Sequence, residues 1–267
     1  MTVESHADVR GLRLAYIDFG GTGTPVLALH GHFGRARMFA PLAAALAPAH
    51  RVIALELRGH GHSNHADGYA PDDYLEDVAA FVRGLGLGPV VVVGHSMGGV
   101  LGFRLAARHP ALVRALVNEE GGALNRRPEI PHPVLDVRPW PRRAPTLDEL
   151  RRQVEAHGIP DAGYFLESAV ERDDGWGFLF DHDAMVESQE ALVGDWWPDW
   201  LGSTCPALLV HGPDSFVLPT SMVREMAGRR PGTVLRELPG CGHWPHDDDP
   251  VAFAGAVREF LGTLATP

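Results

Sequence analysis

The chain is poor in cysteine, in basic residues and in long apolar runs. Its 267 residues include only two cysteines, Cys205 and Cys241, which fit neither a metal-binding spacing nor a disulfide framework. Lys and Arg total 23 against 34 Asp and Glu, so the net charge of −11 disfavours nucleic acid and anionic membranes as partners. No run approaches the roughly 18 apolar residues of a membrane span, and the N-terminus lacks the basic and apolar regions of a secretory signal. These absences predict a cytoplasmic protein, and they leave open whether it forms a homo-oligomer.

What the chain does have is an alternation of strand-like and helix-like segments. Val90–Val93 is a run of four β-branched residues, which is typical of a strand buried on both faces of a parallel sheet. Apolar runs at 26–29 and 52–57 come before it, and a helical pattern at 97–108 and a strand pattern at 114–117 follow it. This order predicts an α/β fold with a mostly parallel sheet and helices on both faces.

The alternation stops after Gly121-Gly122 and resumes near residue 207. The intervening segment starts with a stretch rich in Pro and Arg and continues with helical patterns, and this helical part holds four of the six tryptophans. We therefore predict a core formed by residues 1–122 and 202–267, interrupted by a helical cap at residues 123–201.

A serine lies between the predicted central strand and the helical pattern that follows it, in Gly94-His95-Ser96-Met97-Gly98. A serine at a sharp strand-to-helix turn has a strained backbone and needs small neighbours, because flanking Cβ atoms would clash. The glycines of the motif provide that room. The setting predicts that Ser96 is a nucleophile; the alternative is a glycine-rich turn that only packs the helix.

A serine hydroxyl needs a base to remove its proton. His243 lies late in the chain, after the last predicted strand and behind Gly240-Cys241-Gly242, so it is the predicted general base. His246 is the competitor, with a role in bonding the loop as its alternative. For the oxyanion, the backbone amides of His32 and Met97 are the predicted donors. The imidazole of His32 could contact substrate or hold its loop, and the sequence leaves both open.

Together these segments resemble the α/β-hydrolase fold family across nearly the whole chain. The resemblance implies an eight-stranded, mostly parallel sheet, a cap over the active site and no cofactor. It also assigns the histidines at 60 and 62 to a turn that braces the site, rather than to a metal site, which the intervening glycines disfavour. The matching segments are His30-Gly31, Arg58-Gly59-His60-Gly61-His62-Ser63, Gly94-His95-Ser96-Met97-Gly98-Gly99, and Gly242-His243-Trp244-Pro245-His246.

The third member of a catalytic triad, the acid, departs from the family pattern. Relatives often carry an Asp in a Gly-x-x-Asp pattern after the strand that follows the cap, but here Ser215 occupies that position and Asp214 comes one residue early. Glu119 and Glu120 end the strand after the nucleophile helix, which resembles lactone-opening hydrolases of the zearalenone hydrolase kind. We predict Glu120 as the acid that orients the base, with Asp214 as the alternative and Glu119 behind both.

The predicted activity is hydrolysis of a carboxylic ester or lactone, a small molecule, through an acyl-enzyme. Phe33, Trp176, Trp197 and Trp244 are the candidate substrate contacts, although cap aromatics could instead pack the cap onto the core. The same residues could cleave a C–C bond beside a ketone or perform perhydrolysis. A non-enzyme alternative is a ligand-binding receptor or a non-hydrolytic biosynthetic helper on the same scaffold.

Overall fold

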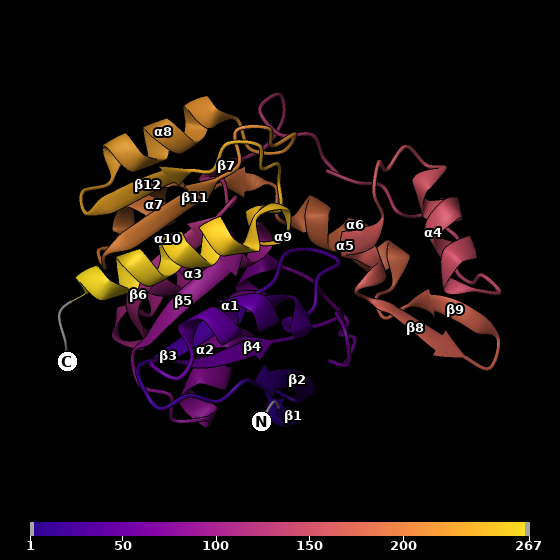
Figure 1. Cartoon of the computed structure of the whole chain (residues 1–267), viewed down its shortest axis with the longest axis horizontal. Helices are drawn as coiled ribbons and strands as arrows, with labels where there is room; N and C mark the ends of the chain where they lie inside the picture. Colours follow the sequence, from indigo (N-terminus) through magenta and orange to yellow (C-terminus); the bar gives the residue numbers. More distant parts are fainter. Residues whose placement is uncertain (1–2, 265–267) are drawn as a thin grey trace.

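The computed structural model describes residues 3–264 and is built around one eight-stranded sheet (Figure 1). Its strand order is β1-β2-β4-β3-β5-β6-β11-β12, and the pairs from β4 to β12 are parallel. Only the β1–β2 and β2–β4 pairs are antiparallel, so the predicted mostly parallel sheet is confirmed. The strands are β1 (Val3–Val9), β2 (Leu12–Asp18), β3 (Pro25–Leu29), β4 (Arg51–Leu55), β5 (Val90–His95), β6 (Val113–Glu119), β11 (Ala207–His211) and β12 (Thr233–Glu237).

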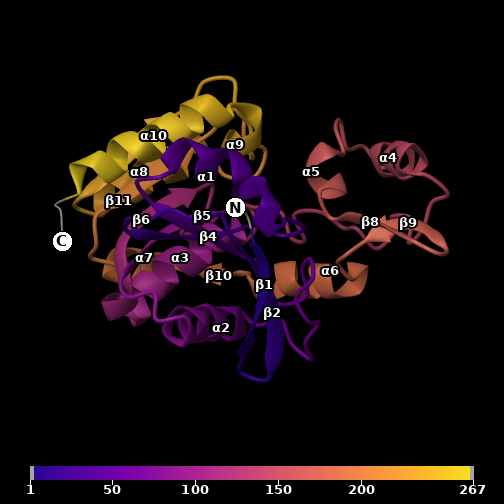
Figure 2. The same ribbon diagram turned by 60° about the horizontal axis from the view of Figure 1, so that its bottom comes forward.

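Helices cover both faces of this sheet (Figure 2). Val91 and Val93 of β5 pack toward α1 and α10, whereas Val90 and Val92 pack toward α2 and α3. Because neighbouring strand residues point to opposite faces, four valines in a row serve two apolar layers. The elements here are η1 (Ala36–Phe39), α1 (Ala40–Leu46), α2 (Pro71–Gly84), α3 (Met97–Arg108), η2 (Pro110–Leu112), α8 (Thr220–Arg229), α9 (Pro245–Asp248) and α10 (Pro250–Thr263).

The segment between β6 and β11 leaves the sheet and forms a lobe beside it, at the right of Figure 1. This lobe is mixed rather than purely helical, because β8 and β9 form an antiparallel hairpin. Gly175, the first residue of β9 after the turn, has φ 110°, a conformation that favours glycine. The elements of the segment are β7 (Leu124–Asn125), α4 (Leu147–Glu155), α5 (Gly163–Leu166), β8 (Ala169–Arg172), β9 (Gly175–Phe178), α6 (His182–Ala191), β10 (Gly194–Asp195) and α7 (Trp197–Gly202).

The last part of the predicted cap packs on the core instead. Helix α7 lies against α3, and Trp200 is fully buried in the core cluster with its Nε1 donating to the Met226 carbonyl at 3.0 Å. The lobe's aromatic side chains form a separate cluster around Trp140, Phe165 and Phe178, which also includes Phe33 of the core. We therefore propose that the cap ends before α7, earlier than residue 201.

Between residues 3 and 264, no helix combines the length and the apolar character that crossing a bilayer requires.

Candidate active site

Ser96 occupies the tight turn between β5 and α3. Its backbone has φ 52° and ψ −115°, a strained conformation for a residue with a side chain. A Cβ at Gly94 would lie 2.2 Å from the Gly98 carbonyl oxygen, and a Cβ at Gly98 would lie 2.2 Å from the carbonyl oxygen of Leu29. The motif glycines therefore allow the close approach of β3, β5 and α3 that exposes a serine above the sheet.

His243 reaches this serine from the loop between β12 and α9. Its Nε2 lies 3.1 Å from the Ser96 Oγ. The loop is held by His95, whose Nε2 donates to the His243 carbonyl at 2.8 Å. The structure therefore brings together the two residues that the sequence predicts as nucleophile and base.

Glu120 reaches the other nitrogen of the same imidazole. Its Oε2 lies 3.3 Å from the His243 Nδ1. A carboxylate only accepts hydrogen bonds, so Nδ1 carries the proton and Nε2 is left to accept from the Ser96 hydroxyl. This is the tautomer that a general base needs.

The backbone at the end of β6 turns sharply to place Glu120. Glu120 has φ 60°, and the side chain of Asn118 closes the turn by bonding both the amide and the carbonyl of Gly121, at 3.0 and 2.8 Å. Strain of this kind persists only where the surroundings fix it, and it is common at functional sites.

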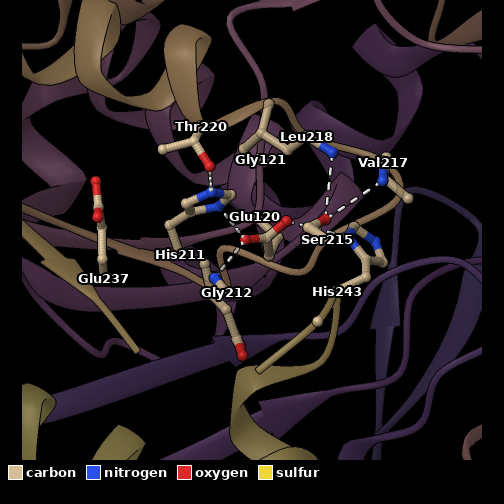
Figure 3. A network of polar contacts seen from close by, with 12 residues as sticks. Glu120, Gly121, His211, Gly212, Ser215, Val217, Leu218, Thr220, Glu237 and His243 are labelled. Atoms are coloured by element: carbon tan, nitrogen blue, oxygen red, sulfur yellow. Dashed lines mark hydrogen bonds and ion pairs between the residues drawn. The ribbon is translucent and has the colours of Figure 1, made fainter. Parts of the chain in front are cut away.

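Three further groups hold the Glu120 carboxylate (Figure 3). His211 Nδ1 donates to Oε1 at 2.6 Å, the Gly212 amide donates to the same oxygen at 2.9 Å, and the Ser215 hydroxyl also bonds the carboxylate. Burial raises the pKa of Glu120, but the hydrogen bonds from His211 and His243 outweigh burial and hold the pKa below its ordinary value. The carboxylate is therefore ionised at neutral pH.

Asp214, the alternative acid, lies apart from this network. Its side chain is exposed, and its amide donates to the Cys241 carbonyl at 3.1 Å. Ser215, at the position where the family resemblance implies an Asp, bonds Glu120 instead and accepts the amides of Val217 and Leu218, each at 3.3 Å. Position 215 thus still contacts the site, but through a hydroxyl.

Glu119 points away from Ser96 and pairs with His246. Its Oε1 accepts the His246 amide at 2.7 Å and the His246 Nδ1 at 2.9 Å. Both side chains are buried. Burial lowers the pKa of His246, but the charge and hydrogen bond of Glu119 outweigh burial and raise the pKa above its ordinary value.

The predicted oxyanion loop after β3 is held mainly by the cap. Tyr164 Oη donates to the His32 carbonyl at 3.0 Å, and Ser168 Oγ donates to the Phe33 carbonyl at 2.5 Å. The His32 imidazole bonds Ser188 Oγ of α6 at 2.9 Å, and that hydroxyl lies 3.0 Å from the Tyr74 hydroxyl. The His32 ring therefore links the loop to the cap, although it also lines the space at Ser96.

The turn after β4 braces this loop from below. The Glu56 carboxylate accepts Arg35 Nε at 2.7 Å and the His62 amide at 2.6 Å. The Leu57 amide donates to the Nε2 of His30 at 3.0 Å. Among residues 3–264, no group of three His, Cys, Asp or Glu side chains is placed to hold a metal ion.

Two adjoining cavities meet at Ser96, and only some of the predicted substrate contacts line them. Phe33 and Trp244 line the cavity on the His243 side. Trp176 is paired with Ala144 through two backbone hydrogen bonds of 2.8 Å, and Trp197 stacks on Arg229, whose guanidinium lies 4.0 Å from the ring centroid. Neither Trp176 nor Trp197 lines either of these two cavities, so their role as substrate contacts stays a prediction without support from the cavity lining.

A larger and more open hollow lies elsewhere on the surface. It lies between the cap and the 65–69 loop, is lined mainly by polar side chains such as Arg142 and His182, and does not include Ser96.

Residues 26–256 match the alpha/beta hydrolase family. The chain belongs to this family. The 2-(acetamidomethylene)succinate hydrolase of Mesorhizobium japonicum is 29% identical over 252 residues, covering 90% of this chain and 89% of the relative. The sn-1-specific diacylglycerol lipase ABHD11 of Mus musculus is 28% identical, covering 97% of this chain and 88% of the relative.

Solved structures agree with this assignment. The crystal structure of E-2-(acetamidomethylene)succinate hydrolase has a TM-score of 0.85 at 24% identity, covering 98% of this chain and 100% of that one. The enol-lactonase from Burkholderia xenovorans has a TM-score of 0.77 at 25% identity, covering 97% of this chain and 100% of that one. The predicted fold family is therefore confirmed.

Sequence reasoning missed the residues that support the site. His211 ends β11, a strand that aligns with the end of β6 in the sheet, so a polar residue there was the available signal. His95, inside the serine motif, and Ser188, in the cap, carried no local pattern that distinguished them.

Proposed function

We propose that the protein is a serine hydrolase that cleaves a carboxylic ester or lactone through an acyl-enzyme. The observation that carries the proposal is one continuous chain of hydrogen bonds, from Ser96 Oγ through both ring nitrogens of His243 to Glu120. The first step requires a hydroxyl, a neutral imidazole and a carboxylate, and this chain of contacts places the three groups in that order.

In this proposal Ser96 Oγ attacks the substrate carbonyl carbon while its proton passes to the Nε2 of His243. The negative charge that develops on the carbonyl oxygen is held by the amides of His32 and Met97, the latter at the N-terminus of α3. His243 then gives the proton to the leaving alkoxide, and the C–O bond breaks. A water molecule, activated by the same imidazole, hydrolyses the acyl-enzyme. Glu120 stabilises the imidazolium formed in both halves.

Relatives of several kinds support a carboxyl-carbon reaction of this type. They include an enol-lactonase, a diacylglycerol lipase and a putative esterase/lipase of Haemophilus influenzae. These names all denote hydrolases of esters or lactones, and they differ in substrate. The ester or lactone class therefore belongs to the proposal, and an individual substrate does not.

Labelling with a fluorophosphonate tests the proposal. We expect stoichiometric labelling of the wild-type protein and loss of labelling in Ser96→Ala. Ser221→Ala, an exposed serine on α8, is the matched control and should label like wild type. A panel of activated esters and lactones should then be hydrolysed by the wild type and the control only. Absence of labelling in the wild type, beside a labelled control esterase, would contradict the proposal.

A further inference from the structure

Two cavities adjoin Ser96, and His243 lines only the first of them. The first, here the leaving-group lobe, is lined by Tyr164, Phe165, Phe216, His243 and Trp244. The second, here the acyl lobe, is lined by Met97, Val100, Ile130, His132 and Leu192. His243 must hand its proton to the leaving oxygen, so the leaving group lies on the His243 side and the acyl chain lies in the other lobe. This assignment rests on the proposed acyl-enzyme reaction.

The acyl lobe offers no positive charge to a substrate. Its lining among the described residues contains no Arg or Lys, and Glu120 forms part of its wall. Burial lowers the pKa of His32 to about 3, and burial together with the charge of Arg127 lowers the pKa of His132. Arg127 itself is exposed and donates to the His132 carbonyl at 2.5 Å. A substrate carboxylate in this lobe would lose its hydration without a cationic partner, beside an existing negative charge.

One polar side chain of the lobe, His132, makes no hydrogen bond of ordinary geometry among the described residues, and both of its ring nitrogens are shielded from solvent. The ring lies near the backbone of Gln189, which is its one nearby polar contact there. The two side-chain amides of the lobe already have partners. Asn125 Nδ2 donates to the Leu192 carbonyl at 3.0 Å, and the Gln189 side chain bonds the amide and carbonyl of Leu135 at 2.9 and 3.0 Å. A buried polar group without a partner is costly, and a ligand that supplies the partner recovers that cost.

We propose that the acyl lobe binds a short, uncharged acyl group that carries a hydrogen-bonding oxygen, and that His132 recognises this oxygen. A neutral imidazole offers one N–H donor, which suits a ketone, amide or ether oxygen. The aliphatic walls from Val100, Ile130 and Leu192 cover the methylene part of the group. His132 is in this view a specificity-determining residue, since the hydrolytic steps do not use it.

Three p-nitrophenyl esters of nearly equal shape test this proposal. They are the 5-oxohexanoate, which carries a ketone; the 5-methylhexanoate, which carries an isopropyl group in its place; and the hydrogen glutarate, which carries a carboxylate there. We expect kcat/KM of the wild type to fall in that order. The ketone should exceed its hydrocarbon counterpart by about fivefold, and the carboxylate should be about a hundredfold poorer than the ketone. Equal constants for ketone and hydrocarbon, or a preference for the carboxylate, would overturn the proposal.

The variant His132→Leu links any preference to this side chain. It should lower the ratio of ketone to hydrocarbon kcat/KM to about one, and the hydrocarbon ester reports on folding and on the catalytic groups within the same preparation. His157→Leu, an exposed histidine just after α4, is the matched control and should keep the wild-type ratio. A ratio of ketone to hydrocarbon kcat/KM that stays unchanged in His132→Leu would overturn the proposal. A wild type that hydrolyses none of the three esters and does not label would instead defeat the hydrolase function itself, and the inference with it.

Discussion

Two consecutive carboxylates, Glu119 and Glu120, each pair with a buried histidine, yet only one of the two pairs reaches the serine. Glu120 bonds His243, whose second nitrogen reaches Ser96. Glu119 bonds His246, and that pair lies beneath the site without reaching the serine. Neighbouring residues at a strand end point to opposite sides, so one strand end supplies both pairs.

The comparison teaches that a buried His–Glu pair by itself does not define a catalytic dyad. The Glu119 pair carries the features often taken as a signal, which are burial, a short hydrogen bond and a shifted histidine pKa. What distinguishes the Glu120 pair is the serine at its far end. The His246 pair instead ties the α9 loop to the end of β6 and so fixes the loop on which His243 sits.

Replacing the two histidines in turn should give the largest contrast. His243→Ala should lower kcat by about 10⁴-fold or more, because the serine loses its base. His246→Ala should lower kcat by no more than about tenfold while reducing the free energy of unfolding. Steady-state hydrolysis of an activated ester and urea denaturation of both variants measure the contrast. Comparable losses of kcat would contradict the separation of roles.

Replacing Glu119 should affect stability in a pH-dependent manner. The pKa of His246 is raised in the folded state, so its contribution is complete below about pH 6.5 and fades as the pH rises through the folded pKa. Glu119→Gln removes the charge partner of this histidine and should cost about 2–4 kcal/mol of unfolding free energy near pH 6.

The loss should shrink as the pH rises through the folded-state pKa of His246, above which this histidine is neutral in both states. Denaturant titrations of wild type and Glu119→Gln at pH 6 and pH 9 give the comparison. A loss that is larger at pH 9 would have the wrong sign for this pair.

His211 should matter through Glu120. His211→Leu removes a 2.6 Å hydrogen bond that helps to lower the pKa of Glu120, so that pKa should rise. We expect kcat to fall by about tenfold with little change in KM, and the acid limb of the pH profile to move to higher pH. A change in stability alone, with the acid limb in place, would reduce His211 to a packing role. His211→Gln, which keeps a donor, should recover part of the loss.

The sequence predicts those parts of the fold and of the site that depend on residues close together in the chain. Ser96 and His243 each lie in a short motif in which neighbouring glycines allow the tight backbone turn, so consecutive residues are enough to predict them. The four valines of β5 predict a buried parallel strand in the same way. For the acid, the sequence predicts Glu120, with Asp214 as the alternative and Glu119 behind both. The fold places the Glu120 carboxylate at His243.

Features set by distant parts of the chain could not be predicted in the same way. The partners of Glu120 come from β11 and the loop after it, about ninety residues away in sequence. Trp176 and Trp197 were assigned to substrate because the sequence alone does not distinguish a tryptophan that lines a cap pocket from one that packs in a hairpin or stacks on an arginine. The β8–β9 hairpin was not predicted because helical patterns surround it in the sequence, and the glycine that follows its turn was the overlooked signal.

The aromatic residues give the smallest expected effect. Trp244→Ala enlarges the leaving-group lobe and should lower kcat/KM for esters of bulky alcohols by about tenfold. Trp197→Ala, the matched control on α7, should leave kcat/KM within about twofold, because its ring stacks on Arg229. Equal losses in both variants would mean that the lobe does not contact the alcohol.

The acylation rate of acid-site variants tests the central claim most directly. The burst of p-nitrophenol from an activated ester, followed by stopped flow, reports attack by Ser96 before deacylation. We predict that Glu120→Gln slows this burst by about 10³-fold or more, because His243 loses its tautomer and its counter-charge, while Asp214→Asn stays within about threefold of wild type. A slow burst in Asp214→Asn with a normal burst in Glu120→Gln would contradict the account.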